Sequence, residues 1–290
     1  MDARLAELLS VLELERIELN VFRGLSRDIG SPQVFGGQVL GQALRAAYAT
    51  VPAERSAHSL HAYFLRRGDF NAPIVYFVDR SRDGQSISSR RVAAIQHGEQ
   101  IFNLAASFQV EQAGVEHQMS IPDVPPPESL PDSPLLPRAR LEGLPEKMRQ
   151  FYALARPFEF RMAEAVDGPV ARSAPAVQHI WIRAVDRLPD EDQLHRCLLA
   201  YVSDFYLLNT ATLPHAAMFL RGSPFLATID HAMWFHWAPR VDEWFLYSLD
   251  SPSASGSRGF SRGSVFQRDG RLVASTAQEG LLRVPATPAS

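Results

Sequence analysis

Hydrophobic residues follow first a helical and then a strand spacing along the first 110 residues. Four leucines with helical spacing predict an N-terminal helix: Leu5, Leu8, Leu9 and Leu12. Ile17, Leu19 and Val21 alternate with Glu18, Asn20 and Phe22, which predicts a strand at 17–22. The Ala- and Leu-rich run 38–51 predicts a helix after two glycines. Strands are expected next, with glycine turns between the later ones, at 59–65, 74–78, 90–95 and 101–110.

The same order of elements returns in the second half of the chain. Residues 177–185 alternate as a strand, and the apolar run from Leu194 to Leu208 predicts one long helix. A helix that is apolar on nearly all sides must be covered, so each half should wrap a sheet around its helix in an α+β fold. The covering strands of this half are expected near 226–237, 244–249, 258–267 and 271–284.

The residues themselves also repeat between the two halves. HSLHAYFLR at 58–66 resembles TIDHAMWFH at 228–236, and aligning His61 with His231 gives an offset of 170. RRVAAIQHGEQIFNLAA resembles SRGSVFQRDGRLVASTA, where the glycines at 98 and 270 align with an offset of 172. An offset that changes this little indicates a duplicated domain with small insertions.

A proline-rich stretch separates the two copies. Residues 121–137 hold seven of the 21 prolines, and this density excludes a helix or a central strand. The stretch is either an extended linker or an ordered loop packed on one domain. The predicted division is an N-terminal domain at 1–115, a proline-rich linker at 116–150 and a C-terminal domain at 151–290.

Composition narrows the class of protein. Apolar residues make up 46% and charged residues 21%, which suits a globular core and excludes a disordered chain. The net charge of −3 argues against nucleic acid as a partner. Cys197 is the single cysteine, so no intrachain disulfide can form. The acid-rich N-terminus is unlike a signal peptide and no apolar run reaches 18 residues, so we expect a cytoplasmic location without membrane insertion.

Three polar residues interrupt apolar patterns in the second copy. Asp204 lies on an apolar helix face, where a carboxylate is costly without partners, although a surface position or a local backbone bond is the alternative. Gln278 interrupts the apolar face of the last strand, although a core amide more commonly satisfies neighbouring backbone. Thr228 opens a strand, which threonine also favours for steric reasons alone.

The two copies differ at these positions. At an offset of 170 Thr228 corresponds to His58, and at 172 Gln278 corresponds to Ala106, as expected if one copy keeps a working site. His58 is a candidate general base, whereas the match of His61 with His231 favours a shared structural role.

The remaining sequence motifs give only weak indications of function. Gly37, in the glycine pair before a helix, could present a backbone N–H to an anion or a polarised carbonyl, or simply form a turn. No HExxH, GxSxG, Walker A or GxGxxG motif occurs, so neither a metal nor a cofactor is expected.

Taken together, several segments resemble acyl-CoA thioesterase II of the TesB type across nearly the whole chain: VFGGQVLGQAL, HSLHAYFLR, RDGQSISSRRVAAIQHG, YVSDFYLL, ATIDHAMWFH and SRGFSRGSVFQRDGRLVASTAQEG. The resemblance implies a tandem double hotdog, with two antiparallel sheets that each wrap around a long central helix and pack as a pseudo-dimer. It also implies a catalytic trio of Asp204, Thr228 and Gln278, and hydrolysis of fatty acyl-CoA to free fatty acid and coenzyme A.

The implied chemistry suits these side chains. Asp204 would accept a proton from a water held by Thr228 and Gln278, while attack by Asp204 itself through an anhydride stays open. The phosphates of coenzyme A call for basic groups, for which Arg91 and Arg262 are candidates together with Arg90 and Arg258.

Two other activities and an assembly state complete the predictions. A hotdog hydratase or dehydratase and a non-catalytic acyl-CoA-binding module are the alternatives. Because hotdog sheets tend to pair, we expect a homodimer or homotetramer.

Overall fold

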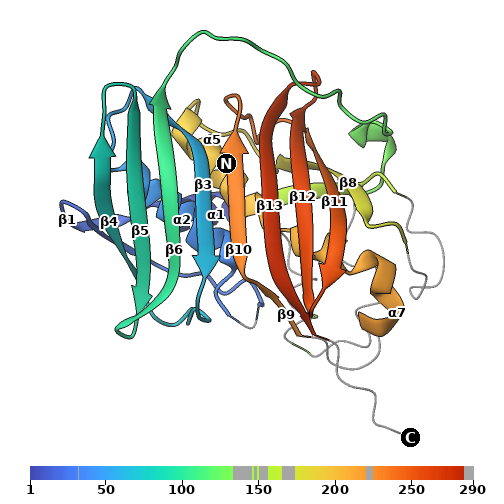
Figure 1. Ribbon diagram of the computed structural model, residues 1–290, viewed down its shortest axis with the longest axis horizontal. Coiled ribbons are helices and arrows are strands. Elements are labelled where there is room, and N and C mark those ends of the chain that lie inside the picture. Colours follow the sequence, from blue (N-terminus) through green and yellow to red (C-terminus); the bar gives the residue numbers. More distant parts are fainter. Residues whose placement is uncertain are drawn as a thin grey trace, which may run out of the picture.

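The structure, a computed structural model, describes residues 1–31, 33–132, 146, 149, 156–164, 174–219 and 225–283. In these residues an antiparallel sheet of 13 strands carries both halves of the chain. Figure 1 shows the strands side by side, from blue and green in the N-terminal half to orange and red in the C-terminal half, with the main helices behind them.

The N-terminal half follows the predicted order closely. Helix α1 (Ala3–Leu12) precedes the short strands β1 (Glu15–Glu18) and β2 (Val21–Gly24), and α2 (Gly36–Tyr48) follows. Four longer strands then form the sheet: β3 (Arg55–Phe64), β4 (Ile74–Asp83), β5 (Ile87–Gln96) and β6 (Glu99–Val110). The predicted single strand at 17–22 is wrong, because the chain turns back at Leu19 and Asn20 and pairs Glu18 with Val21. Alternation alone cannot reveal such a turn.

The C-terminal half repeats this order with more interruptions. Strands β7 (Phe158–Met162) and β8 (Val177–Ala184) precede helix α5 (Asp192–Ser203), and three one-turn helices follow: α6 (Leu207–Thr210), η2 (Leu213–His215) and α7 (Ala216–Phe219). The predicted strand at 226–237 is divided into β9 (Phe225–Thr228) and β10 (Asp230–Phe235). Three strands complete the sheet: β11 (Phe245–Ser255), β12 (Arg258–Gln267) and β13 (Leu272–Arg283).

The two halves are joined through their sheets. Strand β3 of the first half pairs with β10 of the second, where Ala232 lies opposite His61, so the two sheets that were predicted form one continuous sheet. The helices α2 and α5 pack against each other. Gly37 permits their close approach, because a Cβ atom there would lie 2.1 Å from the Tyr201 carbonyl oxygen of α5.

The described part of the proline-rich stretch is a packed loop. Ile121, Val124 and Leu130 pack against the apolar cluster of Trp181 and its neighbours on the C-terminal sheet. The Trp181 indole N–H donates to the Pro125 carbonyl at 2.9 Å. In this stretch the short helix η1 (Pro127–Ser129) forms one turn. The predicted linker boundary at residue 150 lies outside the described residues, so the domain division stays a prediction.

Candidate active site

Asp204 lies where helix α5 ends, at the junction of the two halves. The helix was predicted to continue to Leu208, but it stops at Ser203 and Asp204 forms its C-cap. Tyr206 then adopts a left-handed backbone with φ of 67°, which is strained for a residue with a side chain. Local propensity favours a continued helix here, but packing of the aromatic rings stabilises the turn, with the ring centroids of Phe205 and Phe35 4.4 Å apart.

The carboxylate of Asp204 accepts hydrogen bonds from both halves. Gln278 Nε2 donates to Asp204 Oδ1 at 2.8 Å, and the Gly37 backbone N–H also hydrogen-bonds to this carboxylate. A Cβ atom at Gly36 would lie 2.7 Å from Oδ2, so the carboxylate sits against the first turn of α2. The N-terminus of a helix favours negative charge, and no acidic residue of α2 itself occupies that turn.

Burial dominates the protonation of this carboxylate. Removal from water raises the pKa of Asp204 above its usual 3.8, while the hydrogen bonds from Gln278 and Gly37 lower it. A carboxylate with a raised pKa is a stronger base than an exposed one. Asp204 is therefore suited to accept a proton.

Gln278 connects Asp204 to a second polar group. It lies on β13 with its side chain fully buried, and its Nε2 is also 3.2 Å from His231 Nδ1. Within the described residues its carbonyl oxygen, Oε1, has no hydrogen-bond partner, and neither has the buried Ser261 hydroxyl directly opposite on β12. Two buried polar atoms without a partner therefore lie on paired positions of neighbouring strands, and both can hydrogen-bond to a water or a substrate atom.

Thr228 lies close to this pair on the same face of the sheet. It ends β9 and lies opposite Gly280 of β13, two positions beyond Gln278. Residues two apart on a strand share a face, as do directly paired residues. The structure thus joins Asp204 to Gln278 by a hydrogen bond and places Thr228 beside them by register.

The alignment of His61 with His231 is wrong by one position. His231 is fully buried and faces the helices, whereas His61 is exposed and lies against Trp234. A shift of one residue reverses the faces of a strand, and an offset of 171 aligns His231 with the buried Leu60 instead. The same correction removes the pairing of Thr228 with His58.

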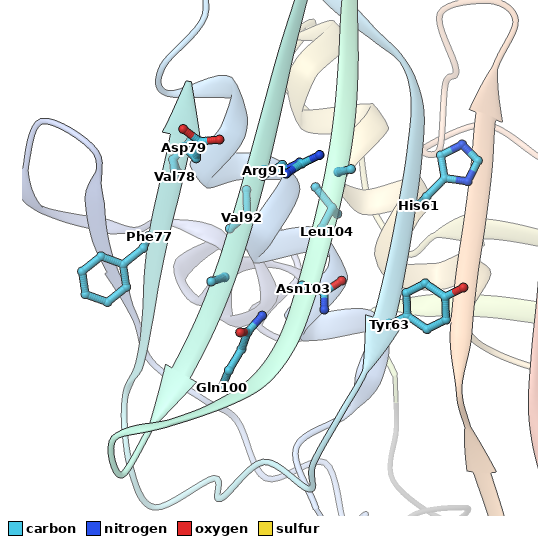
Figure 2. A pocket seen from close by; sticks show the side chains of 12 residues that line it. His61, Tyr63, Phe77, Val78, Asp79, Arg91, Val92, Gln100, Asn103 and Leu104 are labelled. Carbon is cyan, nitrogen blue, oxygen red and sulfur yellow. The ribbon is translucent and has the colours of Figure 1, made fainter. Parts of the chain in front are cut away.

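The other predicted site residues lie away from Asp204. His58 binds Ser107 at 2.8 Å, and Arg196 near the beginning of α5 helps to lower its pKa, after the larger effect of burial. Arg91 lies opposite Asp79 on the outer face of the sheet, where both line a groove of about 660 Å³ (Figure 2). Arg262 is also exposed on the outer face and pairs with Asp250.

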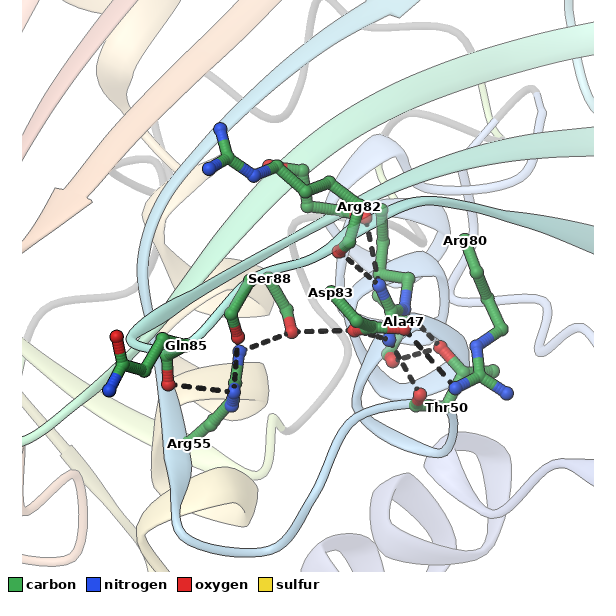
Figure 3. Close-up of polar contacts among 11 residues, drawn as sticks. Ala47, Thr50, Arg55, Arg80, Arg82, Asp83, Gln85 and Ser88 are labelled. Carbon is green, nitrogen blue, oxygen red and sulfur yellow. Dashed lines mark hydrogen bonds and ion pairs between the residues drawn. The ribbon is translucent and has the colours of Figure 1, made fainter.

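The corresponding place in the N-terminal half is filled. At an offset of 171, Arg90 of β5 corresponds to Ser261 of β12, and its guanidinium is fully buried. Its Nε donates to the Thr50 hydroxyl at 2.8 Å, just beyond α2, and its Nη2 donates to Asp83 at 2.6 Å. Figure 3 shows Thr50, Asp83 and Ser88 in this network. Ala106 corresponds to Gln278, so the polar groups of the site are found in one copy only.

Comparison with known proteins identifies the family. Residues 26–109 match the model of the acyl-CoA thioesterase N-terminal domain, and residues 155–281 match that of acyl-CoA thioesterase. The chain is 42% identical over 283 residues to acyl-CoA thioesterase 2 of Haemophilus influenzae, covering 98% of this chain and 99% of that protein. This chain belongs to the acyl-CoA thioesterase II family.

Other relatives agree with this membership. Human acyl-coenzyme A thioesterase 8 is 40% identical over 291 residues, with 98% of this chain and 91% of that protein covered. The crystal structure of acyl-CoA thioesterase II TesB2 from Mycobacterium marinum has a TM-score of 0.80 at 41% identity and covers 96% of this chain and 99% of that one. A hot dog fold protein from Alicyclobacillus acidocaldarius, at 19% identity and a TM-score of 0.76, shares the fold. The predicted hotdog fold and the thioesterase family are thus confirmed.

Two features of the site escaped the sequence analysis. Ser261 and Ser203 are common residue types in ordinary strand and helix contexts, and nothing in their spacing marks them. The position of His231 beside Gln278 does not follow from its alignment with His61, because that register is wrong by one residue. Within the described ranges, no three His, Cys, Asp or Glu side chains lie close enough together to hold a metal ion.

Proposed function

We propose that this protein hydrolyses acyl-CoA thioesters with Asp204 as the general base toward water. The observation that carries the proposal is the hydrogen bond from the fully buried Gln278 side chain to Asp204 Oδ1, beside the first turn of α2. Membership of the acyl-CoA thioesterase II family supports the thioester as substrate class. Thr228 and Gln278 would hold the water and set its angle of attack.

The reaction balances with these groups alone. Asp204 takes a proton from the water as the water oxygen bonds to the thioester carbonyl carbon. Collapse of the tetrahedral intermediate breaks the carbon–sulfur bond, and the proton passes from Asp204 to the departing sulfur. The products are the free acid and coenzyme A, and the carboxylate is regenerated.

Isotope labelling distinguishes the role of base from that of nucleophile. Hydrogen bonds from Gln278 and Gly37 hold the carboxylate in place and affect both roles alike. Attack by the carboxylate would form an anhydride, and where water opens this anhydride at the Asp204 carbonyl carbon, single-turnover hydrolysis in ¹⁸O-labelled water places label in the Asp204 side chain. With Asp204 as base, label enters only the released acid.

The alternatives have weaker support. A hydratase or dehydratase needs a histidine next to the helix carboxylate, but His231 hydrogen-bonds to Gln278 and Ser203 instead. A non-catalytic acyl-CoA-binding module would not need a buried carboxylate with a raised pKa. Release of free thiol from a ladder of acyl-CoA chain lengths supports hydrolysis, a change in enoyl absorbance supports hydration, and binding without either supports a binding module.

The variant that tests the mechanism is Asp204→Asn. It retains the shape of the side chain but removes the base, so we expect thiol release to fall by about 10²–10⁴-fold. A matched control is Asp230→Asn, because burial also raises the pKa of Asp230 but its carboxylate accepts from the Glu279 backbone N–H. A folded Asp204→Asn protein with wild-type activity would refute the role of general base.

Assembly and location belong to the same proposal. We propose a homodimer or homotetramer in the cytoplasm, and light scattering that gives a particle of 32.3 kDa would contradict the assembly. None of the helices in the described residues has the length and hydropathy of a membrane span. Arg91, Arg262 and His58 stay predicted substrate-binding residues, and none of them takes or gives a proton in the proposed steps.

A further inference from the structure

A chain of buried hydrogen bonds leads from helix α5 to the Gln278 amide. Ser203 Oγ donates to the Ala200 carbonyl oxygen at 2.9 Å, and the same Oγ is 3.1 Å from His231 Nε2. His231 Nδ1 is 3.2 Å from Gln278 Nε2, which donates to Asp204 as well. His231, Ser203 and Gln278 are each at most 1% exposed, so water does not compete for these bonds.

The direction of each bond in the chain follows from the number of protons. We assign the single hydroxyl proton of Ser203 to the Ala200 carbonyl oxygen, so that Ser203 Oγ accepts from His231. His231 therefore carries its proton on Nε2, and its Nδ1 is left as an acceptor. Burial lowers the pKa of His231 to about 3, so the ring is neutral at ordinary pH and keeps one proton.

This arrangement determines which way the Gln278 amide faces. Its two N–H groups donate to Asp204 Oδ1 and to His231 Nδ1, both of which are acceptors. A flipped amide would place its carbonyl oxygen against a carboxylate and a ring lone pair, which is doubly unfavourable. The carbonyl oxygen is thus turned away from both, and among the described residues it is buried without a partner.

We propose that His231, held by Ser203, is a positioning residue that turns the Gln278 carbonyl oxygen toward the attacking water. This inference rests on the proposed hydrolysis. The water needs an acceptor for the proton that Asp204 does not take, and Gln278 Oε1 supplies it. Tyr247 helps to hold Ser203 in place, because its hydroxyl donates to the Ser203 backbone carbonyl oxygen at 3.0 Å.

The test compares variants that remove or retain the acceptor at His231 Nδ1. His231→Leu removes it, and we expect kcat to fall by about 10- to 100-fold with little change in KM, because the water and not the acyl-CoA loses its orientation. His231→Asn places an amide oxygen near the former Nδ1 and should restore kcat to within a few-fold of wild type. His236→Leu is the matched control, since His236 is exposed and binds Ser275 at the other end of β10.

A double-mutant cycle separates positioning from a merely structural role. Because His231 acts through Gln278, His231→Leu should cause no further loss of kcat in a Gln278→Ala background. If His231→Leu does not fold, Ser203→Ala tests the same point, since it frees His231 to move its proton to Nδ1 and turn the amide. That variant should also lose kcat, and only when Gln278 is present.

Two results would overturn the inference. The first is a folded His231→Leu or Ser203→Ala protein with wild-type kcat. The second is a kcat of the His231→Leu, Gln278→Ala double variant that is reduced by the product of the two single-variant factors. Asp204→Asn, measured in parallel, keeps the two proposals apart. An active Asp204→Asn protein rejects the general base, whereas an inactive one beside a fully active His231→Leu protein rejects only the positioning role.

Discussion

Replacing Gly37 by alanine tests how closely the two halves must approach to build the site. The new Cβ atom would lie 2.1 Å from the Tyr201 carbonyl oxygen and 2.5 Å from a carbon of the Phe35 ring. Van der Waals contact requires about 3.5 Å, so the Tyr201 oxygen must retreat by more than about 1 Å. The Phe35 ring can rotate, but the Tyr201 oxygen belongs to the backbone of α5 and moves only with that helix.

The expected loss of stability is modest and the expected loss of activity is larger. Overpacking of this kind costs about 1–3 kcal/mol, of which the better helix propensity of alanine returns up to about 1 kcal/mol. A net loss of up to about 2 kcal/mol should lower Tm by up to about 8 °C. Asp204 follows Tyr201 by three residues, and a displacement of about 1 Å at a reacting group can cost about 10²-fold in rate.

The assay combines a thermal melt with thiol release at saturating acyl-CoA. Gly41→Ala is a graded control in the same helix, because its Cβ atom would lie 3.1 Å from the Cys197 carbonyl oxygen. Gly114→Ala is a neutral control, since nothing lies within 4 Å of its new atom. If Gly37→Ala keeps the wild-type Tm and kcat, the close approach of α2 to α5 does not position Asp204 and the reasoning fails.

Two further predictions follow from the charged groups. Because a base works only when ionised and burial raises the pKa of Asp204 above 3.8, activity should fall as the pH drops through this raised value. A profile of kcat/KM whose acid limb lies at or below pH 3.8 would contradict this. Arg90→Met should lower the free energy of unfolding by about 2–3 kcal/mol, since its charged hydrogen bonds to Thr50 and Asp83 are lost, without reducing activity per folded molecule. The hydroxyl of Ser88 and then Arg90 lower the pKa of Asp83 to about 2, so the ionised carboxylate stabilises the fold above pH 3.8 and this stabilisation is lost as the pH falls through 2. Chemical unfolding of wild type and Arg90→Met at neutral and at acid pH therefore measures the effect of the substitution and its dependence on Asp83. An Arg90→Met protein that loses activity but not stability would assign the N-terminal half a working site.

Local patterns predicted most of the fold because burial is periodic along each element. Every long strand of the first half falls on a predicted one, since alternating exposure follows the pleat of a half-buried sheet. The failures occur where distant contacts override local preference. The chain leaves α5 at Ser203 because aromatic rings from elsewhere pack on Phe205, and no pattern near that residue reports them.

The candidate site shows the same division. Gln278 stood out because an amide interrupts a buried face, and its full burial is as the alternation predicts. Ser261 did not stand out, since a serine in a strand is ordinary until its partner across the sheet is known. The repeat gave the wrong face for His61, because a sequence alignment that ignores the alternation of faces along a strand cannot exclude a shift of one residue.

The sequence by itself determined that the chain is a duplicated α+β unit of the acyl-CoA thioesterase II family, because periodicity, repeats and motifs are local properties. Only the tertiary structure decided that the two sheets join at β3 and β10 and that the Gly37 backbone N–H of one half hydrogen-bonds to the Asp204 carboxylate of the other. It also decided the direction of the Gln278 amide, through His231 and Ser203. These features depend on atoms far apart in the chain, and their contacts exist only once packing has brought them together.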